Sequence, residues 1–136
     1  MKSLFTPKEV IAVIDVSYRQ LQYWDHSKFI GPTIRKGARK TRMFTFKDLV
    51  LLETAVQLRE KGYSVQRLRN IITNLRNLVD NLPFPLVDVT LLFRGDEILV
   101  FSGEVTTNLN PKEFILLSVR RLRNHVNAHF SEEAAA

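Results

Sequence analysis

Four polar side chains without a negative charge are spaced so that they share the outer face of one short helix: Tyr18, Arg19, Gln22 and Tyr23. A guanidinium suits the acceptors of a guanine edge or a phosphate, a primary amide suits adenine, and the two phenols can reach phosphates. Leu21 and Trp24, three positions apart, occupy the opposite face and can pack on a neighbouring helix. The face is suited to contacts with double-stranded DNA, and a solvated polar face without a ligand is the alternative.

A basic cluster follows within residues 26–44. Five cationic side chains fall within eight positions: Arg35, Lys36, Arg39, Lys40 and Arg42. Two glycines, a proline and the β-favouring Met43-Phe44 surround them, which predicts a β-ribbon. Charges so close repel one another, so the ribbon is either a mobile loop or a strand pair that lies along a phosphate backbone.

Two short helices must position the polar face. Thr6-Pro7-Lys8-Glu9 is a helix start with a capping Thr, Pro at the first helical position and Glu three residues after the Thr. This helix must end near Asp15, because Ser17 caps a second helix that runs through Asp25. Two short helices joined by so tight a turn predict a helix-turn-helix.

Two further helices follow the ribbon. Thr45, with Asp48 three residues on, begins a helix that ends at Gly62, and Ser64 caps the next one. The apolar positions of this fourth helix follow the three-four spacing of a two-helix seam: Val65, Leu68, Ile72, Leu75, Val79 and Leu82. We expect this seam to join two copies of the chain, and packing within one monomer is the alternative.

The composition changes after Pro83 and Pro85, which end the fourth helix. Leu86–Phe93 and Glu97–Phe101 are rich in β-branched and apolar residues and flank Arg94-Gly95-Asp96, which predicts a hairpin.

A last helix is expected from the Asn110-Pro111-Lys112-Glu113 start to about His129, and a third strand at Phe114–Val119 is the competing interpretation. Its apolar stripe comprises Ile115, Val119, Leu122 and Val126. Residues 131–136 read as a disordered tail.

The charge is unevenly distributed. The whole chain carries +6, but residues 1–76 hold fifteen Lys and Arg against six Asp and Glu, or +9, whereas residues 77–136 hold five against eight, or −3. Only the first half is expected to bind a polyanion. The chain has no long apolar run and no apolar core of a secretory signal near its N-terminus, so we expect a cytoplasmic protein that is associated with the nucleoid and not with a membrane.

The residues do not suggest an enzyme. There is no Cys, no Gly-rich phosphate loop after a strand and no nucleophile elbow. His125 and His129 lie one helical turn apart, but no third ligand stands at an obvious spacing, so we expect neither a metal nor a cofactor.

Four segments in order carry a resemblance: Val16 to Asp25 (VSYRQLQYWD), Phe29-Ile30-Gly31-Pro32, Arg42-Met43-Phe44, and Glu60-Lys61-Gly62-Tyr63-Ser64. Over about residues 5–75 the chain resembles the DNA-binding domain of the MerR family, with its Arg-x-Leu-x-Tyr-aromatic-acid recognition helix, its Arg-x-aromatic wing strand and its Gly-aromatic-Ser helix junction.

The resemblance implies a homodimer that binds a palindromic promoter site and deforms the DNA so that RNA polymerase can engage. By the same resemblance, Tyr18 and Arg19 would face bases and nearby phosphate, Tyr23 phosphate, and Arg42 with the basic cluster the flanking backbone. The start of the fourth helix, with Ser64 and Arg67, would add a phosphate contact, and Ser17 and Gln22 complete the expected DNA-binding set.

The chain also departs from the family pattern. Asp15 stands where the turn usually has Gly, Tyr18 where Pro is common, and Gln22 where a basic residue is common. Pro83 and Pro85 cut short the long dimer helix of typical members, which leaves the C-terminal half outside the resemblance.

Together these features predict an α+β, mainly α fold: a MerR-type winged helix-turn-helix, a short coiled-coil-like helix, and a small C-terminal segment with a hairpin and a helix. We expect a DNA-binding domain at 1–76, the end of the dimerisation helix at 77–82, and a dimerisation or effector segment at 83–130. The expected function is transcription regulation, and an architectural or recombination accessory protein that bends DNA is the alternative. Because so small a segment can hardly enclose a sizeable pocket, dimerisation is favoured over ligand sensing for residues 83–130.

Overall fold

The computed structural model describes residues 2–37, 41–82, 88–103, 105 and 114–135 of the 136-residue chain. Five helices and two three-stranded antiparallel sheets make up this part, which confirms the α+β, mainly α prediction. The elements, in chain order, are β1 (Leu4–Phe5), α1 (Pro7–Val13), α2 (Tyr18–His26), β2 (Ile34–Lys36), β3 (Thr41–Thr45), α3 (Phe46–Glu60), α4 (Val65–Val79), β4 (Val89–Arg94), β5 (Glu97–Ser102), β6 (Ile115–Ser118) and α5 (Val119–Ala135).

The first half is a winged helix-turn-helix. Helices α1 and α2 both begin with the expected capping residues: Thr6 forms a reciprocal capping box with Glu9, and Ser17 forms one with Gln20. Strands β2 and β3 form the predicted ribbon, with Arg35 opposite Arg42. Strand β1, which the sequence analysis did not foresee, pairs with the end of β3 and closes a sheet of order β1-β3-β2.

The apolar seam of α4 lies inside the chain's own core. Leu68, Ile72, Leu75 and Val79 are at most 4% exposed in the single chain, where α4 packs on α3. These four side chains cannot also form an intermolecular seam in this conformation, so packing within the monomer, the alternative, accounts for their spacing. Of the other two residues of the seam, Val65 is 69% exposed and Leu82 is partly buried against the core.

The C-terminal segment contains the predicted hairpin and a strand in place of the expected helix start. Strands β4 and β5 pair around the two-residue loop Gly95-Asp96, and β6 adds to the other side of β4, so the sheet order is β5-β4-β6. The competing interpretation of a strand at 114–119 was therefore correct, and Asn110-Pro111-Lys112-Glu113 lies outside the described residues. The last helix begins at Val119 and continues to Ala135, so the backbone of residues 131–135, expected to be a disordered tail, is helical.

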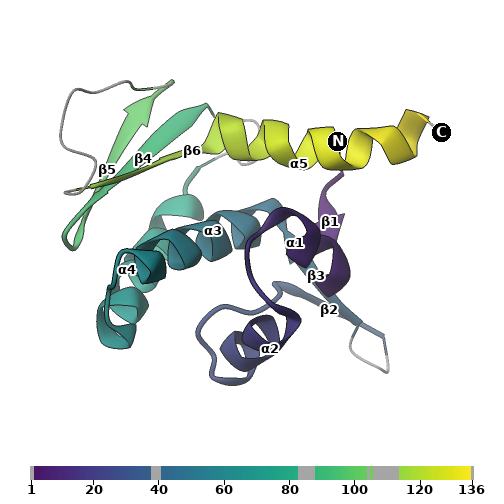
Figure 1. The fold of residues 1–136 in the computed structure, drawn as a ribbon, viewed down its shortest axis with the longest axis horizontal. Coiled ribbons are helices and arrows are strands. Elements are labelled where there is room, and N and C mark those ends of the chain that lie inside the picture. Colours follow the sequence, from purple (N-terminus) through teal and green to yellow (C-terminus); the bar gives the residue numbers. More distant parts are fainter. Residues whose placement is uncertain (1, 38–40, 83–87, 104, 106–113, 136) are drawn as a thin grey trace.

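One hydrophobic core joins the two halves of the chain. Helix α5 runs along one side of the molecule (Figure 1). The ring of its Phe130 lies 5.7 Å from the Phe5 ring of β1, measured between ring centroids. Buried residues from α1, α2, α3, α4, β4, β6 and α5 form a single cluster. In Figure 1, α3 lies between the C-terminal sheet and α2, so these two parts of the molecule are separated by the core.

Candidate nucleic-acid interface

Helix α2 presents the four predicted polar side chains to solvent. The Ser17 Oγ accepts a hydrogen bond from the Gln20 N–H at 3.0 Å, which fixes the first turn. Leu21 and Trp24 are buried as expected. With that face turned to the core, Arg19 and Gln22 are exposed, as are Tyr18 and Tyr23, at 47% and 67%.

Three of these four side chains have no partner among the residues that the structure describes. Arg19, Gln22 and Tyr23 make no hydrogen bond, ion pair or ring contact with the part of the chain that the structure describes. Because these side chains are exposed, their donors and acceptors are accessible to a ligand. Tyr18 differs, because its hydroxyl accepts a hydrogen bond from the Arg42 guanidinium at 3.2 Å.

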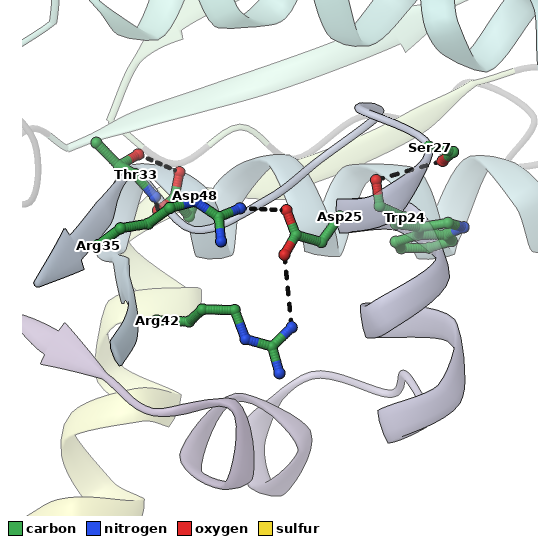
Figure 2. A network of polar contacts seen from close by, with 7 residues as sticks. All are labelled: Trp24, Asp25, Ser27, Thr33, Arg35, Arg42 and Asp48. Carbon is green, nitrogen blue, oxygen red and sulfur yellow. Dashed lines mark hydrogen bonds and ion pairs between the residues drawn. The ribbon is translucent and has the colours of Figure 1, made fainter. Parts of the chain in front are cut away.

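The wing is tied to α2 through the Asp25 carboxylate. One carboxylate oxygen pairs with the Arg35 guanidinium and the other accepts a bond from Arg42 at 3.4 Å (Figure 2). The Asp25 side chain is 14% exposed, so the pair with Arg35 is less screened than a fully exposed ion pair. Arg42 thus bridges the end of α2, through Asp25, and its start, through Tyr18, and fixes how the ribbon stands beside the helix.

A second carboxylate fixes the connection between α2 and the ribbon. Asp48, at 4% exposure, accepts bonds from the Thr33 N–H at 2.9 Å, the Thr33 hydroxyl at 2.7 Å and the Thr45 N–H at 2.9 Å. Only the capping bond with Thr45 was expected from the sequence. The additional bonds to Thr33 attach the loop after α2 to the first turn of α3 (Figure 2).

A basic groove of about 910 Å³ separates α2 from the loop and wing. Its lining includes Arg19, Arg35, Arg42 and Arg76 together with Gln22 and Tyr23. Arg76 comes from α4 and donates a hydrogen bond to the Phe29 carbonyl oxygen at 2.9 Å, which secures the loop that forms the groove's wall. The groove therefore brings the three side chains of α2 that have no described partner onto the same positively charged surface as the two arginines held by Asp25.

The remaining predicted DNA-binding residues are divided between other places. Arg39 and Lys40 lie outside the described residues, and Lys36 is described only by its backbone in β2. Ser64 and Arg67 have roles within the chain: the Ser64 Oγ caps α4, and the Arg67 Nε bonds to the Asp96 carboxylate of the hairpin at 3.0 Å. Arg67 also stacks over the Tyr63 ring at 4.3 Å.

Three components of the interface were not expected from the sequence: Asp25, Arg76 and the Thr33–Asp48 contact. A signal for Asp25 existed, because it is the only acidic residue between Val16 and Lys47, a stretch rich in Lys and Arg. A single carboxylate among so many cations is expected to attract several of them. No comparable signal marked Arg76 or Thr33, since their contacts depend on how α4 and the loop meet.

A known protein family and three regulators are similar in sequence to this winged helix-turn-helix. The model of the MerR HTH family of regulatory proteins matches residues 5–75, just over half of the chain.

The chain belongs to the MerR family of helix-turn-helix regulatory proteins.

Three relatives are each 32% identical over 66 residues: uncharacterized HTH-type transcriptional regulators from Mycobacterium bovis and from two strains of Mycobacterium tuberculosis. The matched region is 47% of this chain but only 29% of the length of these relatives. The match to the family model covers the winged helix-turn-helix, up to residue 75.

MerR proteins are transcriptional regulators and not enzymes, in agreement with the sequence-based expectation. Among the described residues, no group of three or more His, Cys, Asp or Glu side chains could hold a metal ion. The His125 Nε2 lies 3.2 Å from the Val13 carbonyl oxygen, so it contacts the end of α1. Within the same part of the chain, no helix combines the length and apolar character needed to cross a membrane.

Proposed function

We propose that this MerR protein is a sequence-specific transcriptional regulator that binds a palindromic promoter site as a homodimer, in the cytoplasm and on the nucleoid. The observation that carries the proposal is the face of α2 with Arg19, Gln22 and Tyr23, beside a wing that holds further arginines. This face is exposed, has no acidic group and has no partner in the described part of the chain. A helix of this kind fits the major groove, and a flanking wing fits the adjacent backbone.

The side chains of α2 and the wing have distinct roles in this proposal. Arg19 and Gln22 contact base edges, because their donors and acceptors suit guanine and adenine in the major groove. Tyr18 and Tyr23 contact phosphates. Ser17 keeps its capping bond. It lies at the N-terminus of α2, where the helix dipole favours a phosphate.

The wing contributes affinity more than sequence preference. Arg35 and Arg42 approach the flanking phosphates while Asp25 holds them in place, and the other basic residues of the ribbon, Lys36, Arg39 and Lys40, add to the positive charge. Phosphate contacts of this kind position a protein on DNA without reading bases. Arg67 would join them only through the nitrogens that Asp96 leaves free, and Ser64 only through its backbone at the start of α4.

A homodimer follows from the single recognition helix in each chain. One α2 covers one half-site, and two copies related by a twofold axis cover a palindrome. Regulation of a promoter then requires RNA polymerase as a further partner. Deformation of the DNA by the bound dimer would allow the polymerase to engage.

The test is DNA binding by purified wild-type protein and two arginine variants. The ligands are a duplex from immediately upstream of the protein's own gene and a scrambled duplex of equal composition, each titrated against salt. Arg19→Ala should weaken binding by about 1 to 3 kcal/mol, roughly 5- to 150-fold, and reduce the preference for the native duplex. Arg94→Ala, an exposed arginine of the hairpin, is the matched control and should bind as the wild type does.

Lys40→Ala separates the wing from the recognition helix. It should weaken binding to both duplexes equally and reduce the slope of log affinity against log salt by about one unit. Equal affinity of the wild type for the native and scrambled duplexes would contradict the sequence-specific regulator and favour an architectural protein. An unchanged preference in Arg19→Ala would contradict the role of Arg19.

A further inference from the structure

Strand β5 is an apolar edge of the C-terminal sheet. It occupies one end of the order β5-β4-β6, and Leu99, Val100 and Phe101 are 37%, 40% and 39% exposed. Leu99 and Phe101 share the sheet face with Leu92 and Thr90, whereas Val100 shares the face with the buried Leu91, so the exposed apolar surface continues around both faces of the strand. Edges of this kind are usually protected by a charge, a proline or a bulge. Between Ile98 and Ser102 this edge has none of them.

The backbone of β5 has a row of groups without a partner strand in the described part of the chain. In the antiparallel ladder, alternate residues exchange hydrogen bonds with the partner strand. The Gly103 N–H bonds to the Asp88 carbonyl oxygen at 2.7 Å, in the same register that pairs Phe101 with Thr90 and Leu99 with Leu92. Odd-numbered residues therefore bond toward β4, and the N–H and C=O groups of Ile98, Val100 and Ser102 point away from it. No described strand pairs with them.

We infer that a second copy of the chain pairs with this edge, β5 against β5, to form a continuous six-stranded sheet across a twofold axis. The inference rests on the homodimer of the proposed function and names its surface. Only residues whose backbone groups point outward can exchange bonds, so the axis must relate even-numbered residues to one another.

The side chains select the position of the axis. With the axis at Val100, each Val100 faces its copy, Ile98 faces Ser102, and Leu99 faces Phe101 on the same sheet face. Glu97 then lies beyond the apolar pairs, opposite Gly103. An axis shifted toward Leu99 would place Glu97 opposite Phe101 and bury a carboxylate against a ring, which is unfavourable.

A second copy suits β5 better than it suits the other edge. Strand β6 has only four residues, alternately buried, and leads directly into α5. At the hairpin tip the β4–β5 unit is fastened to the start of α4 by the bond from the Tyr63 hydroxyl to the Gly95 carbonyl oxygen and by the Arg67–Asp96 pair. These contacts would couple a dimer interface at β5 to the helices that support α2.

The experiment is analytical ultracentrifugation of the full chain without DNA, across a dilution series. The wild type should sediment with twice the mass of one chain. Val100→Lys and Val100→Glu each place two like charges face to face at the axis, so each should raise the dimer dissociation constant by about tenfold or more. An equimolar mixture of the two variants pairs Lys with Glu and should restore the dimer. Ile11→Lys, at a residue with the same 37% exposure as Leu99 but on α1, is the control and should remain dimeric.

The outcomes distinguish the surface from the proposed function. If Val100→Lys remains as dimeric as Ile11→Lys, β5 is not the interface, although the regulator can still be a dimer. If the mixture of variants stays monomeric, the twofold pairing at Val100 is wrong. If the wild type is monomeric at all concentrations, both the surface and the homodimer fail. A folded Val100→Lys monomer, verified by circular dichroism, should bind a duplex with a single half-site as the wild type does, which separates a lost dimer from lost DNA binding.

Discussion

Asp25 determines which cations of the interface are free and which are held. It pairs with Arg35 and Arg42, so these two wing arginines have fixed positions before any ligand arrives, whereas Arg19 has no partner within the described ranges. Held cations lose less side-chain entropy when they bind a phosphate. A free guanidinium on α2 keeps all its donors for a base edge. One carboxylate thus separates positioning from recognition.

Gly31 is required by the position of this carboxylate. A Cβ at residue 31 would overlap the Asp25 Oδ1, so Gly31→Ala must displace Asp25 and weaken its pairs with the wing. Because the displaced atom ends a partly exposed side chain, the expected cost is at the lower end of the range for overpacking, about 1 kcal/mol. In an Asp25→Ala background the overlap is removed, and the same substitution should cost much less. Urea unfolding of the four proteins of this double-mutant cycle measures the difference. Additive free energies would show that Gly31 does not act through Asp25.

Glu9 gives the N-terminus a defined response to pH. Its burial raises the pKa of the carboxyl, but the hydrogen bond from the Thr6 N–H at 2.9 Å and the Lys2 ammonium at 2.9 Å outweigh that effect, so the pKa is lower than its ordinary 4.5. The stability that the charged form contributes is fully present above pH 4.5 and is lost as the pH falls through the lowered pKa of the folded state.

Glu9→Gln tests this response because the amide oxygen can still accept the Thr6 bond. The wild type should melt at a higher temperature than the variant at neutral pH, and the difference should shrink below pH 4.5. Thermal melts of both proteins from pH 3 to 7 measure it. A difference that stays constant over this range would assign the effect of the substitution to packing and not to charge.

The helix starts of the first half could be predicted at the scale of elements because their signals are local. Thr6, Ser17, Thr45 and Ser64 each cap the helix that was expected after them. Contacts between elements have no such local signal. The three-four spacing of α4 indicates only that one face is covered, and it does not tell whether α3 or a second chain covers it.

The C-terminal strand shows the same limit in the opposite direction. Ile115 to Val119 is compatible with a helical stripe and with a strand, and the Asn-Pro start before it favoured the helix. Pairing of Leu117 with Leu91 and of Ile115 with Phe93 decided for the strand, because both sides of those pairs are buried. The choice depended on β4, which lies more than twenty residues earlier in the sequence.

Asp48 connects three elements, and its substitution should show how much that connection contributes. Asp48→Ala removes both acceptor oxygens, so the N–H groups of Thr33 and Thr45 and the Thr33 hydroxyl lose their partner. The expected loss is about 1 to 3 kcal/mol in the free energy of unfolding, measured in urea. Thr33→Val removes only the exposed threonine's hydroxyl bond and should cost less. A larger loss for Thr33→Val than for Asp48→Ala would contradict the central role of the carboxylate.

At the scale of the whole molecule, the single core predicts that both halves unfold together. The chain divides by charge and by resemblance near residue 76, yet Phe5 and Val10 of the first half and Phe93, Val126 and Phe130 of the second belong to one buried cluster. Helix α5 joins them by packing over β1 and α1. A domain boundary in the energetic sense is therefore not expected there.

The only tryptophan allows this expectation to be tested. Trp24 is buried in α2, so its fluorescence reports the first half, whereas Phe93 is fully buried in β4 of the second. Phe93→Leu should lower the unfolding free energy by about 1 kcal/mol, and Phe93→Ala, if it folds, by about 3 to 5 kcal/mol. Because the core is shared, the urea midpoint seen by Trp24 fluorescence should fall by the same amount as the midpoint seen by far-ultraviolet circular dichroism. Val65→Ala, at an exposed position of α4, is the control and should move neither midpoint appreciably. If the fluorescence midpoint stays at its wild-type value while the dichroism midpoint falls, residues 1–76 fold as an independent unit, and the C-terminal sheet would then be an appendage without a shared core.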